Sequence, residues 1–235
     1  MRIGIPMASR AFFIPSHLPP FYEEKTVMFE FFSGFALSQQ QKSIRSMHRS
    51  IKDAWGLNKV LEISTRSESA LGVSLSAFNL MLDYEGRMSS VESLYQASKQ
   101  FSYGGPFPDI AWKSSIDAKK DGRLKVSGPL IHFQYQGTVW PLVGSPNFYD
   151  FLYISALCQS KYVSELSEYE AFSDIAYSTQ VGRLKEGKSW NCQARSVAIF
   201  KSLSSLHIQS KVIDILKGLA QDSSRQIGND SPTLF

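Results

Sequence analysis

The spacing of hydrophobic residues along the chain predicts a mixture of short strands and helices. Between residues 39 and 55, apolar side chains recur at Ile44, Met47 and Ile51, which is the spacing of an amphipathic helix. Further helices are predicted over 147–159, 162–170, 190–204 and 206–219. Strands are predicted over 27–32, 60–63 and 73–82, with a hairpin inside 123–140 that turns at Gln136-Gly137. Because strands come early and helices dominate later, the pattern favours an α+β fold with small antiparallel sheets.

The two ends of the chain lack this periodicity. We predict that residues 1–25 form an extended N-terminal arm on the surface, that 26–220 form one helix-rich domain, and that 221–235 form a loose tail. A chain of 235 residues with 43% hydrophobic residues suits a single domain with a sizeable core. No stretch reaches the ~18 apolar residues of a membrane span, and the N-terminus lacks the pattern of a secretory signal. We therefore expect a cytoplasmic protein with no membrane partner.

Composition narrows the chemistry only slightly. The net charge of +4 is compatible with an anionic ligand but does not demand nucleic acid. The two cysteines and four scattered histidines form no metal-binding or disulfide pattern, so we predict no metal and no cofactor. The outer face of the 39–55 helix is basic, and two interpretations remain open for it: a solvated face or an anion-docking surface. Its cations are Lys42, Arg45, Arg49 and Lys52.

The segment 89–101 contains the best candidate for catalysis. If it is helical throughout, Glu92, Tyr95, Gln96 and Lys99 share one stripe at i, i+3, i+4 and i+7. A carboxylate and an amine on one stripe can supply a general base and a nucleophile. The alternative is structural, because Ser89-x-x-Glu92 also matches a capping box, in which Glu92 only satisfies the helix N-terminus.

Two further places suggest ligand binding. Asn191 or Ser189 can cap the helix that follows, and Arg195 then lies in its first turn, where a bound phosphate would offset the unfavourable cation. The alternative is that Arg195 pairs with an acidic side chain elsewhere in the fold. The turn from Ser102 to Asp109 contains Gly104 and Gly105, and it is either a simple turn or a loop that closes over a ligand beside Lys99.

These places, in this order, resemble the NADAR family, which includes the YbiA-like enzymes. The stretch Val91-Glu92-x-x-Tyr95-Gln96-x-x-Lys99 is similar to the family's central Val-Glu-x-x-x-Gln-x-x-Lys helix. Leu75 to Leu80 resembles its early strand, and 116–123 resembles its Ala-Lys-x-x-Gly-Arg stretch without the proline. A closer resemblance is to the NADAR antitoxins paired with DarT-type DNA ADP-ribosyltransferase toxins. That subgroup is matched by Gly104-Gly105-Pro106, Phe148-Tyr149-Asp150 and Asn191-Cys192-Gln193-Ala194-Arg195-Ser196, and its usual start resembles Met7 to Arg10, which makes Met7 a second candidate for the first residue.

The resemblance implies an ADP-ribosyl glycohydrolase that removes ADP-ribose from guanine in single-stranded DNA and acts as an antitoxin to a DarT-type toxin. It implies that Glu92 and Lys99 are catalytic, with either residue as base, acid or nucleophile, and that ADP-ribose is the product. Tyr103, Phe107 and Trp112 are candidates for stacking on a base. The implied ligand-binding residues are Ser76, Asn79, Tyr95, Gln96, Gly104, Gly105, Asp109, Lys119, Arg123, Asp150, Asn191 and Arg195.

The chain departs from the YbiA-like pattern near its C-terminal end. The late Asp-x-Trp-Gly motif is absent, and Asp174 is the nearest acidic candidate. Two other functions therefore stay open. One is an N-glycosidase that acts on a phosphorylated small molecule, and the other is a non-catalytic protein that binds ADP-ribose or masks the toxin.

Overall fold

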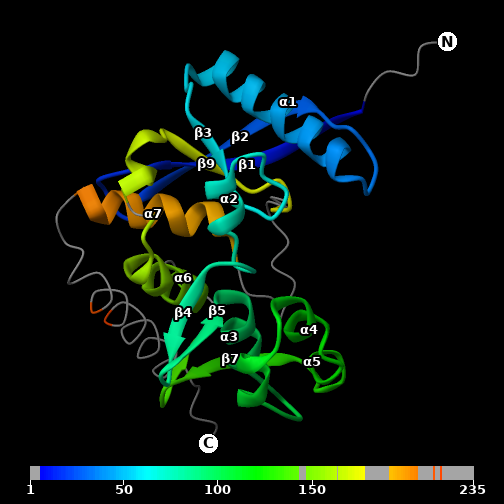
Figure 1. Ribbon diagram of the computed structural model, residues 1–235, viewed down its shortest axis with the longest axis vertical. Coiled ribbons are helices and arrows are strands. Elements are labelled where there is room, and N and C mark those ends of the chain that lie inside the picture. Colours follow the sequence, from blue (N-terminus) through cyan, green and yellow to red (C-terminus); the bar gives the residue numbers. More distant parts are fainter. Residues whose placement is uncertain are drawn as a thin grey trace, which may run out of the picture.

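The computed structural model describes residues 6–142, 147–162, 164–177 and 191–205, with positions 214 and 218. The predicted helix over 206–219, apart from those two positions, and the tail over 221–235 lie outside the described residues. Mixed helices and small sheets make an α+β fold, as predicted from the sequence. Along the longest axis, α1 lies at one end of the molecule and α3, α4 and α5 lie at the other, with α2 between them (Figure 1).

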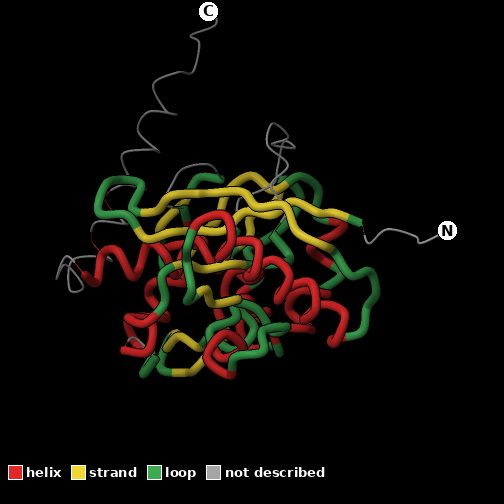
Figure 2. Tube along the Cα trace, turned by 90° about the horizontal axis from the view of Figure 1, so that it is seen from above, coloured by secondary structure: helices red, strands yellow, loops and turns green. Residues whose placement is uncertain are grey.

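A four-stranded sheet with the order β2-β1-β9-β3 forms one end. Its strands are β1 (Met7–Pro15), β2 (Tyr22–Glu30), β3 (Val60–Glu62) and β9 (Ala171–Ser173). Strand β1 pairs antiparallel with both β2 and β9, whereas β3 and β9 pair parallel. The two long strands of the β1–β2 hairpin run along one side of the molecule, with helices beneath them (Figure 2).

The N-terminal segment differs from the expected surface arm. Residues 7–15 are extended, but they form an inner strand of the sheet, and Phe12 and Phe13 are fully buried. The expected boundary after residue 25 falls inside β2. Pro15, Pro19 and Pro20 are typical of an extended arm, but the apolar run from Ala11 to Phe13 is buried in the core.

Helix α1 (Leu37–Trp55) confirms the predicted amphipathic helix and covers one face of this sheet. Its buried residues Ile44, Met47 and Ile51 pack with Phe12, Val27 and Phe29 of the strands. This small core is separate from the main one, because the sheet carries apolar side chains on both faces. The helix therefore keeps its opposite face in solvent.

The segment predicted as a strand over 73–82 was assigned wrongly. Helix α2 (Ala70–Ser74) ends within it, a turn follows, and only Met81 begins the hairpin of β4 (Met81–Tyr84) and β5 (Arg87–Ser90). Leu71 and Leu75, four residues apart, face the main core, so the apolar positions have helical rather than alternating spacing. The turn contains Ala77, whose carbonyl accepts a hydrogen bond from the Glu92 N–H at the start of the next helix.

The following elements build the end of the molecule opposite α1. They are α3 (Val91–Ala97), β6 (Lys99–Phe101), the 3-10 helix η1 (Pro108–Trp112), α4 (Ser115–Lys120), α5 (Arg123–Val126), β7 (Leu130–Tyr135) and β8 (Thr138–Trp140). The predicted hairpin at Gln136-Gly137 is confirmed between β7 and β8, and both turn residues have positive φ, as a type I′ turn requires. Residues 123–126, which were included in that hairpin, are helical instead.

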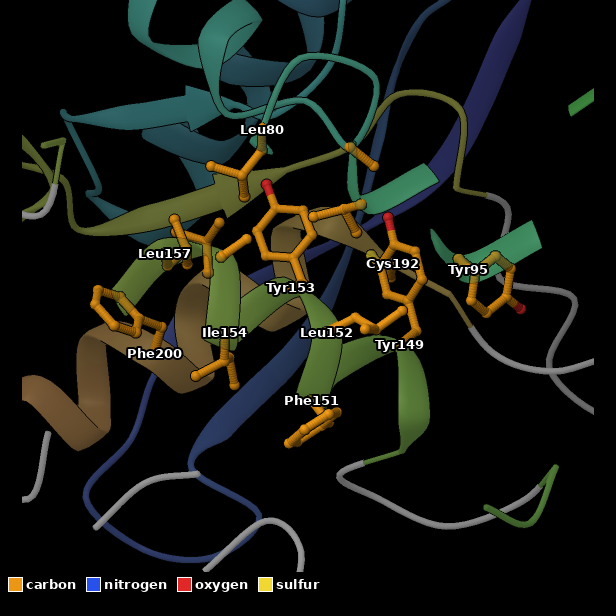
Figure 3. Close-up of a cluster of buried hydrophobic side chains, with 14 of the residues drawn as sticks. Leu80, Tyr95, Tyr149, Phe151, Leu152, Tyr153, Ile154, Leu157, Cys192 and Phe200 are labelled. Carbon is orange, nitrogen blue, oxygen red and sulfur yellow. The ribbon is translucent and has the colours of Figure 1, made fainter. Parts of the chain in front are cut away.

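Helix α6 (Phe148–Gln159) is the centre of the main core. Every residue from Phe148 to Leu157 is buried, because α3, α7 (Gln193–Ser205) and β4 surround the helix. Side chains from all of its faces therefore meet apolar neighbours, as the labelled residues of Figure 3 show. The predicted helices at 147–159 and 190–204 are thus confirmed, while 162–170 contains only the 3-10 turn η2 (Ser164–Glu168).

Candidate functional site

Glu92 lies in the first turn of α3 and is only 4% exposed. The helix is capped by Ser90, whose side chain accepts a hydrogen bond from the Ser93 backbone N–H, so Glu92 is not needed as a cap. The capping-box alternative is therefore wrong. The Glu92 carboxylate instead accepts a hydrogen bond of 2.8 Å from Gln96 Nε2, one turn along the helix. Its other close neighbour is Lys119 of α4, whose Nζ lies 3.9 Å from Oε1.

Lys99 does not lie on the same helix as Glu92. Helix α3 ends at Ala97, and Lys99 begins strand β6, so the predicted stripe at i+7 is wrong as a helical stripe. The charge of Glu92 nevertheless acts on the amine of Lys99. Lys99 Nζ lies 4.9 Å from the centroid of the Tyr95 ring, which is itself buried in the core.

The electrostatics of Lys99 are unusual for a lysine. Burial lowers the pKa of Lys99 to about 8, the negative charge of Glu92 opposes this, and the positive charge of Lys119 adds to it. A substantial fraction of the amine is therefore neutral near pH 8. Lys119 lies close to Glu92, and the charges of both residues act on Lys99. We call Glu92, Lys99 and Lys119 the charge cluster.

Asp174 follows β9 and is a second buried carboxylate on which the charge of Lys119 acts. It is 5% exposed, and its Oδ2 accepts a hydrogen bond of 3.1 Å from Gln193 Nε2. Burial raises the pKa of Asp174, while the bonds from Gln193 and the Ala176 N–H, and the charges of Arg66 and Lys119, lower it. Because Lys119 acts on both carboxylates, Asp174 and Glu92 share one electrostatic environment.

Gln193 ties Asp174 to the start of α3. Its Oε1 accepts a hydrogen bond of 2.6 Å from the Ala77 backbone N–H, and the Ala77 carbonyl accepts one of 2.9 Å from the Glu92 N–H. The backbone of a single residue, Ala77, therefore links the side-chain amide of Gln193 to the backbone of Glu92. Gln193 could not be recognised as a site residue from the sequence, since a glutamine in the first turn of a helix has no distinctive spacing.

Tyr149 of α6 is a second residue that sequence reasoning missed. It is buried, and its ring packs edge-on against Tyr95 at 5.2 Å between centroids. Burial, Tyr153 and the charges of Glu92 and Asp174 raise its pKa well above the ordinary value, so the phenol keeps its proton. Figure 3 shows the hydroxyls of Tyr149 and Tyr153 directed to the same side of α6, opposite to Phe151.

The loop with Gly104 and Gly105 lies against the end of α3. The Phe107 N–H donates to the Ala97 carbonyl, and the Phe101 N–H donates to the Gly104 carbonyl. Gly105 has a φ of +87°, and a β-carbon there would overlap the Lys99 carbonyl oxygen. Gly105 therefore lets this loop pack closely on the Lys99 backbone, whereas Gly104 lies against Ser127 and Phe107.

Asp109 and Arg123 form an ion pair with each other at the surface. Arg123 donates to both oxygens of Asp109, at 3.0 and 2.6 Å, and it also bonds Asp121. Its guanidinium lies 4.6 Å from the centroid of the Phe107 ring. Both predicted ligand-binding residues therefore already have partners within the protein.

Asp150 and Arg195 form a buried ion pair between α6 and α7. Their exposed fractions are 0% and 1%, and Arg195 donates to Asp150 at 3.3 and 2.9 Å. Ser196 Oγ and the Asn147 N–H also donate to the Asp150 carboxylate. This is the alternative stated above, an arginine paired with an acidic side chain elsewhere in the fold. Asn191, by contrast, is exposed just before α7.

The remaining predicted residues occupy different environments. Ser76 is buried and donates to the Val73 carbonyl, while Asn79 is exposed and donates to the same carbonyl. Of the three stacking candidates, Tyr103 is 83% exposed, whereas Phe107 and Trp112 each have an arginine over the ring. Only Tyr103 among these three therefore presents an open ring face.

A cavity of about 260 Å³ lies on the other side of α3 from Glu92. Leu94, Tyr84 and Tyr135 are among its lining residues, and none of the charge cluster is. Within the described part of the chain, no three histidine, cysteine or acidic side chains are grouped as a metal site requires. No helix in that same part is long and apolar enough to cross a membrane.

Comparison with known protein families assigns the sequence to one of them. The sequence profile described as DarT1-associated NADAR antitoxin matches residues 8–225, which is nearly the whole chain. No curated protein is similar enough in sequence to count as a match. The family's description associates its members with DarT1 as antitoxins, in agreement with the resemblance seen in the sequence. The chain therefore belongs to the family of DarT1-associated NADAR antitoxins.

Proposed function

We propose that this protein is a glycohydrolase that removes ADP-ribose from guanine bases in DNA and thereby reverses the modification made by a DarT-type toxin. The observation that carries the proposal is the charge cluster, in which the negative charge of the buried Glu92 acts on the half-buried amine of Lys99. Cleavage of the bond between C1 of ribose and a base nitrogen develops positive charge at C1. A buried carboxylate beside that carbon stabilises this charge strongly.

Lys99 is proposed as the nucleophile. Its lowered pKa supplies the neutral amine, which attacks C1 while the bond from C1 to the guanine nitrogen breaks and the base leaves with a proton. Opening of the ribose ring then gives an imine between C1 and Nζ. Water adds to that imine and releases ADP-ribose and the free lysine, so the overall reaction consumes one water.

Glu92 is proposed to stabilise the developing charge and then to activate that water. The hydrogen bond from Gln96 fixes one carboxylate oxygen in place. Asp174 and the protonated Tyr149 lie in the same electrostatic environment, so they are candidates for binding the ribose hydroxyls. These roles need no metal.

The pyrophosphate of ADP-ribose is proposed to bind Lys119 and Arg66. The side chain of Lys119 is more than half exposed, and its charge acts on both Glu92 and Asp174. Arg195, by contrast, is buried in the core, and Arg123 is paired with two aspartates. Cations that are exposed at the rim of the site suit a doubly charged pyrophosphate. Tyr103, with its open ring face, is proposed to stack on a base.

The test uses a single-stranded DNA oligonucleotide with ADP-ribose on one guanine. It is incubated with the protein and followed by mass spectrometry, and the expected result is loss of the ADP-ribosyl mass with release of ADP-ribose and intact guanine. If the mass stays while the folded protein binds ADP-ribose, the protein is a binder or acts on a small molecule, and the proposal fails.

A second readout tests the covalent step. Borohydride reduces an imine to a stable amine, so adding it during turnover is expected to leave an ADP-ribosyl group on Lys99 that peptide mapping locates. A Lys99→Arg variant cannot form this adduct and is the matched control. If the wild-type protein turns over without trapping, Lys99 is not the nucleophile.

A further inference from the structure

The outer face of α1 carries a row of cations that the proposed reaction does not use. Lys42, Arg45, Arg49 and Lys52 are all exposed, and their spacing of i, i+3, i+7 and i+10 places them on one face. The row is about 15 Å long, given the rise of an α-helix per residue. The opposite face of the same helix is fixed to the sheet by Ile44, Met47 and Ile51.

Most of this positive charge is not neutralised within the described part of the protein. Arg45 forms an ion pair with Glu68, whereas Lys42, Arg49 and Lys52 form none with described residues. Asp53 is the one carboxylate that α1 itself contains. Such a row is a favourable surface for a chain of repeating negative charges.

An exposed aromatic side chain lies just before this row. Phe35 is fully exposed in the loop that leads into α1. The loop is held in place, because Gln40 Nε2 donates to the Phe35 carbonyl at 3.1 Å and Ser43 Oγ accepts from the Phe32 N–H at 2.9 Å. An uncovered ring next to a row of cations is a combination that suits single-stranded nucleic acid, by stacking on bases and contacting phosphates.

The middle of α1 is connected to the site through two contacts. Arg45 pairs with Glu68 in the loop after β3, and the same loop contains Arg66, whose charge acts on Asp174. His48 Nε2 lies 2.8 Å from the hydroxyl of Ser173, the residue before Asp174. These contacts join α1 to the loop after β3 and to the end of β9, and α2 lies between α1 and α3 (Figure 1).

We propose that this face of α1, with Phe35, binds the single-stranded DNA that flanks the modified guanine. The identity of the strand rests on the proposed function. A polyanion matches the length and repetition of the row, and the uncovered Phe35 ring suits a base. An acidic protein surface would use the same cations but would not need an isolated ring, so the ring favours nucleic acid.

Binding of an unmodified single-stranded oligonucleotide, measured by fluorescence anisotropy at several salt concentrations, tests this without any chemistry. Each phosphate contact contributes about 0.7 to the slope of log affinity against log salt. The double variant Lys42→Gln/Arg49→Gln is expected to reduce that slope by about 1.4. Phe35→Ala is expected to weaken binding about fivefold or more at any salt concentration. The matched control is Lys59→Gln/Lys161→Gln, which removes the same charge elsewhere, and its slope is expected to match the wild type.

Three outcomes would contradict the proposed DNA-binding surface. The first is that the control weakens binding as much as the double variant, since net charge alone would then explain the effect. The second is that the double variant binds like the wild type. The third is that Phe35→Ala has no effect while the double variant weakens binding, because the cations would then attract phosphates without the base stacking that the proposed surface requires.

Turnover separates this proposal from the proposed function. Hydrolysis of an ADP-ribosylated guanine nucleoside, which has no flanking strand, is expected to be unchanged in the double variant, while hydrolysis of the long modified oligonucleotide has a raised KM. If the wild-type protein hydrolyses neither substrate but the anisotropy results hold, the proposed function fails and the DNA-binding surface is supported.

Discussion

A β-carbon on Gly105 would overlap the backbone carbonyl oxygen of Lys99, and Gly105 has a φ of +87°. The contact joins the glycine loop to the strand that carries the proposed nucleophile. The loop cannot retreat easily, because Phe107 is bonded to Ala97 at the end of α3. Any side chain at position 105 must therefore displace the backbone of Lys99.

Gly105→Ala is expected to reduce both stability and turnover. The overlap and the positive φ together cost about 2 kcal/mol of unfolding free energy, measured by urea denaturation. Turnover is expected to fall by at least tenfold in protein that remains folded, because the Lys99 backbone moves. The control is Gly86→Ala, where φ is +75° but the space is open. It is expected to cost about 1 kcal/mol and to leave turnover unchanged. Wild-type turnover in Gly105→Ala would show that the contact does not position Lys99.

Glu92→Gln is expected to abolish turnover while the fold remains intact. The amide has the same shape and its oxygen can still accept the hydrogen bond from Gln96, but it carries no charge to stabilise C1. Loss of a catalytic carboxylate typically costs a factor of about 100 to 10,000. Release of ADP-ribose measures the effect, and circular dichroism checks the fold. The neighbouring substitution Asp117→Asn, at an exposed N-terminal position of α4, serves as the control for a general charge effect.

Turnover is expected to rise with pH and to level off above about pH 8, because the neutral amine of Lys99 is the reactive form and its pKa is about 8. The measurement is single-turnover rate against pH with saturating enzyme. A rate that falls through the same pH range would instead assign Lys99 as the acid that protonates the leaving base.

Lys99→Met is expected to stabilise the protein at pH 7. The folded pKa of about 8 lies below the ordinary value of 10.5, so at pH 7 the charged amine is held in an unfavourable place. Between pH 8 and 10.5 the unfolded chain binds more protons than the folded one, so the stability of the wild type rises with pH in that interval. The gain from Lys99→Met is therefore about 1–3 kcal/mol at pH 7 and shrinks as the pH approaches 10. Urea denaturation at both pH values measures it. Lys120→Met, at an exposed lysine, is the control, and an equal gain there would contradict the assigned cause.

Asp150→Asn is expected to destabilise the protein strongly without changing ligand affinity in the folded fraction. It leaves the buried Arg195 charge without its carboxylate, which typically costs about 3–5 kcal/mol. Arg123→Gln, which breaks a surface pair with Asp109, is expected to have a much smaller effect on stability. Thermal unfolding and titration with ADP-ribose measure the two quantities. A large loss of ADP-ribose affinity in folded Asp150→Asn would show that this pair contacts the ligand after all.

Residue spacing along the chain predicts the elements whose periodicity is long or whose turn requires particular residues. The helix with Ile44, Met47 and Ile51, the turn at Gln136-Gly137 and the buried helix α6 follow from spacing and local backbone preference alone. The charge of Glu92 does act on Lys99, but the two residues lie on a helix and a strand and not on one helical stripe. The helix between them ends at Ala97, because Ser98 leads directly into a strand that pairs with β7.

Long-range packing sets which charged residues are paired inside the protein and which remain accessible to a ligand. Spacing cannot show that Arg195 and Asp150 meet in the core, because they are 45 residues apart and belong to different helices. It cannot show that the charge of Lys119 acts on Asp174, or that residues 7–15 are an inner strand rather than an arm, because both depend on which distant segments pack together. Burial and long-range pairing assign the role of a charged side chain, and both arise only when the chain folds.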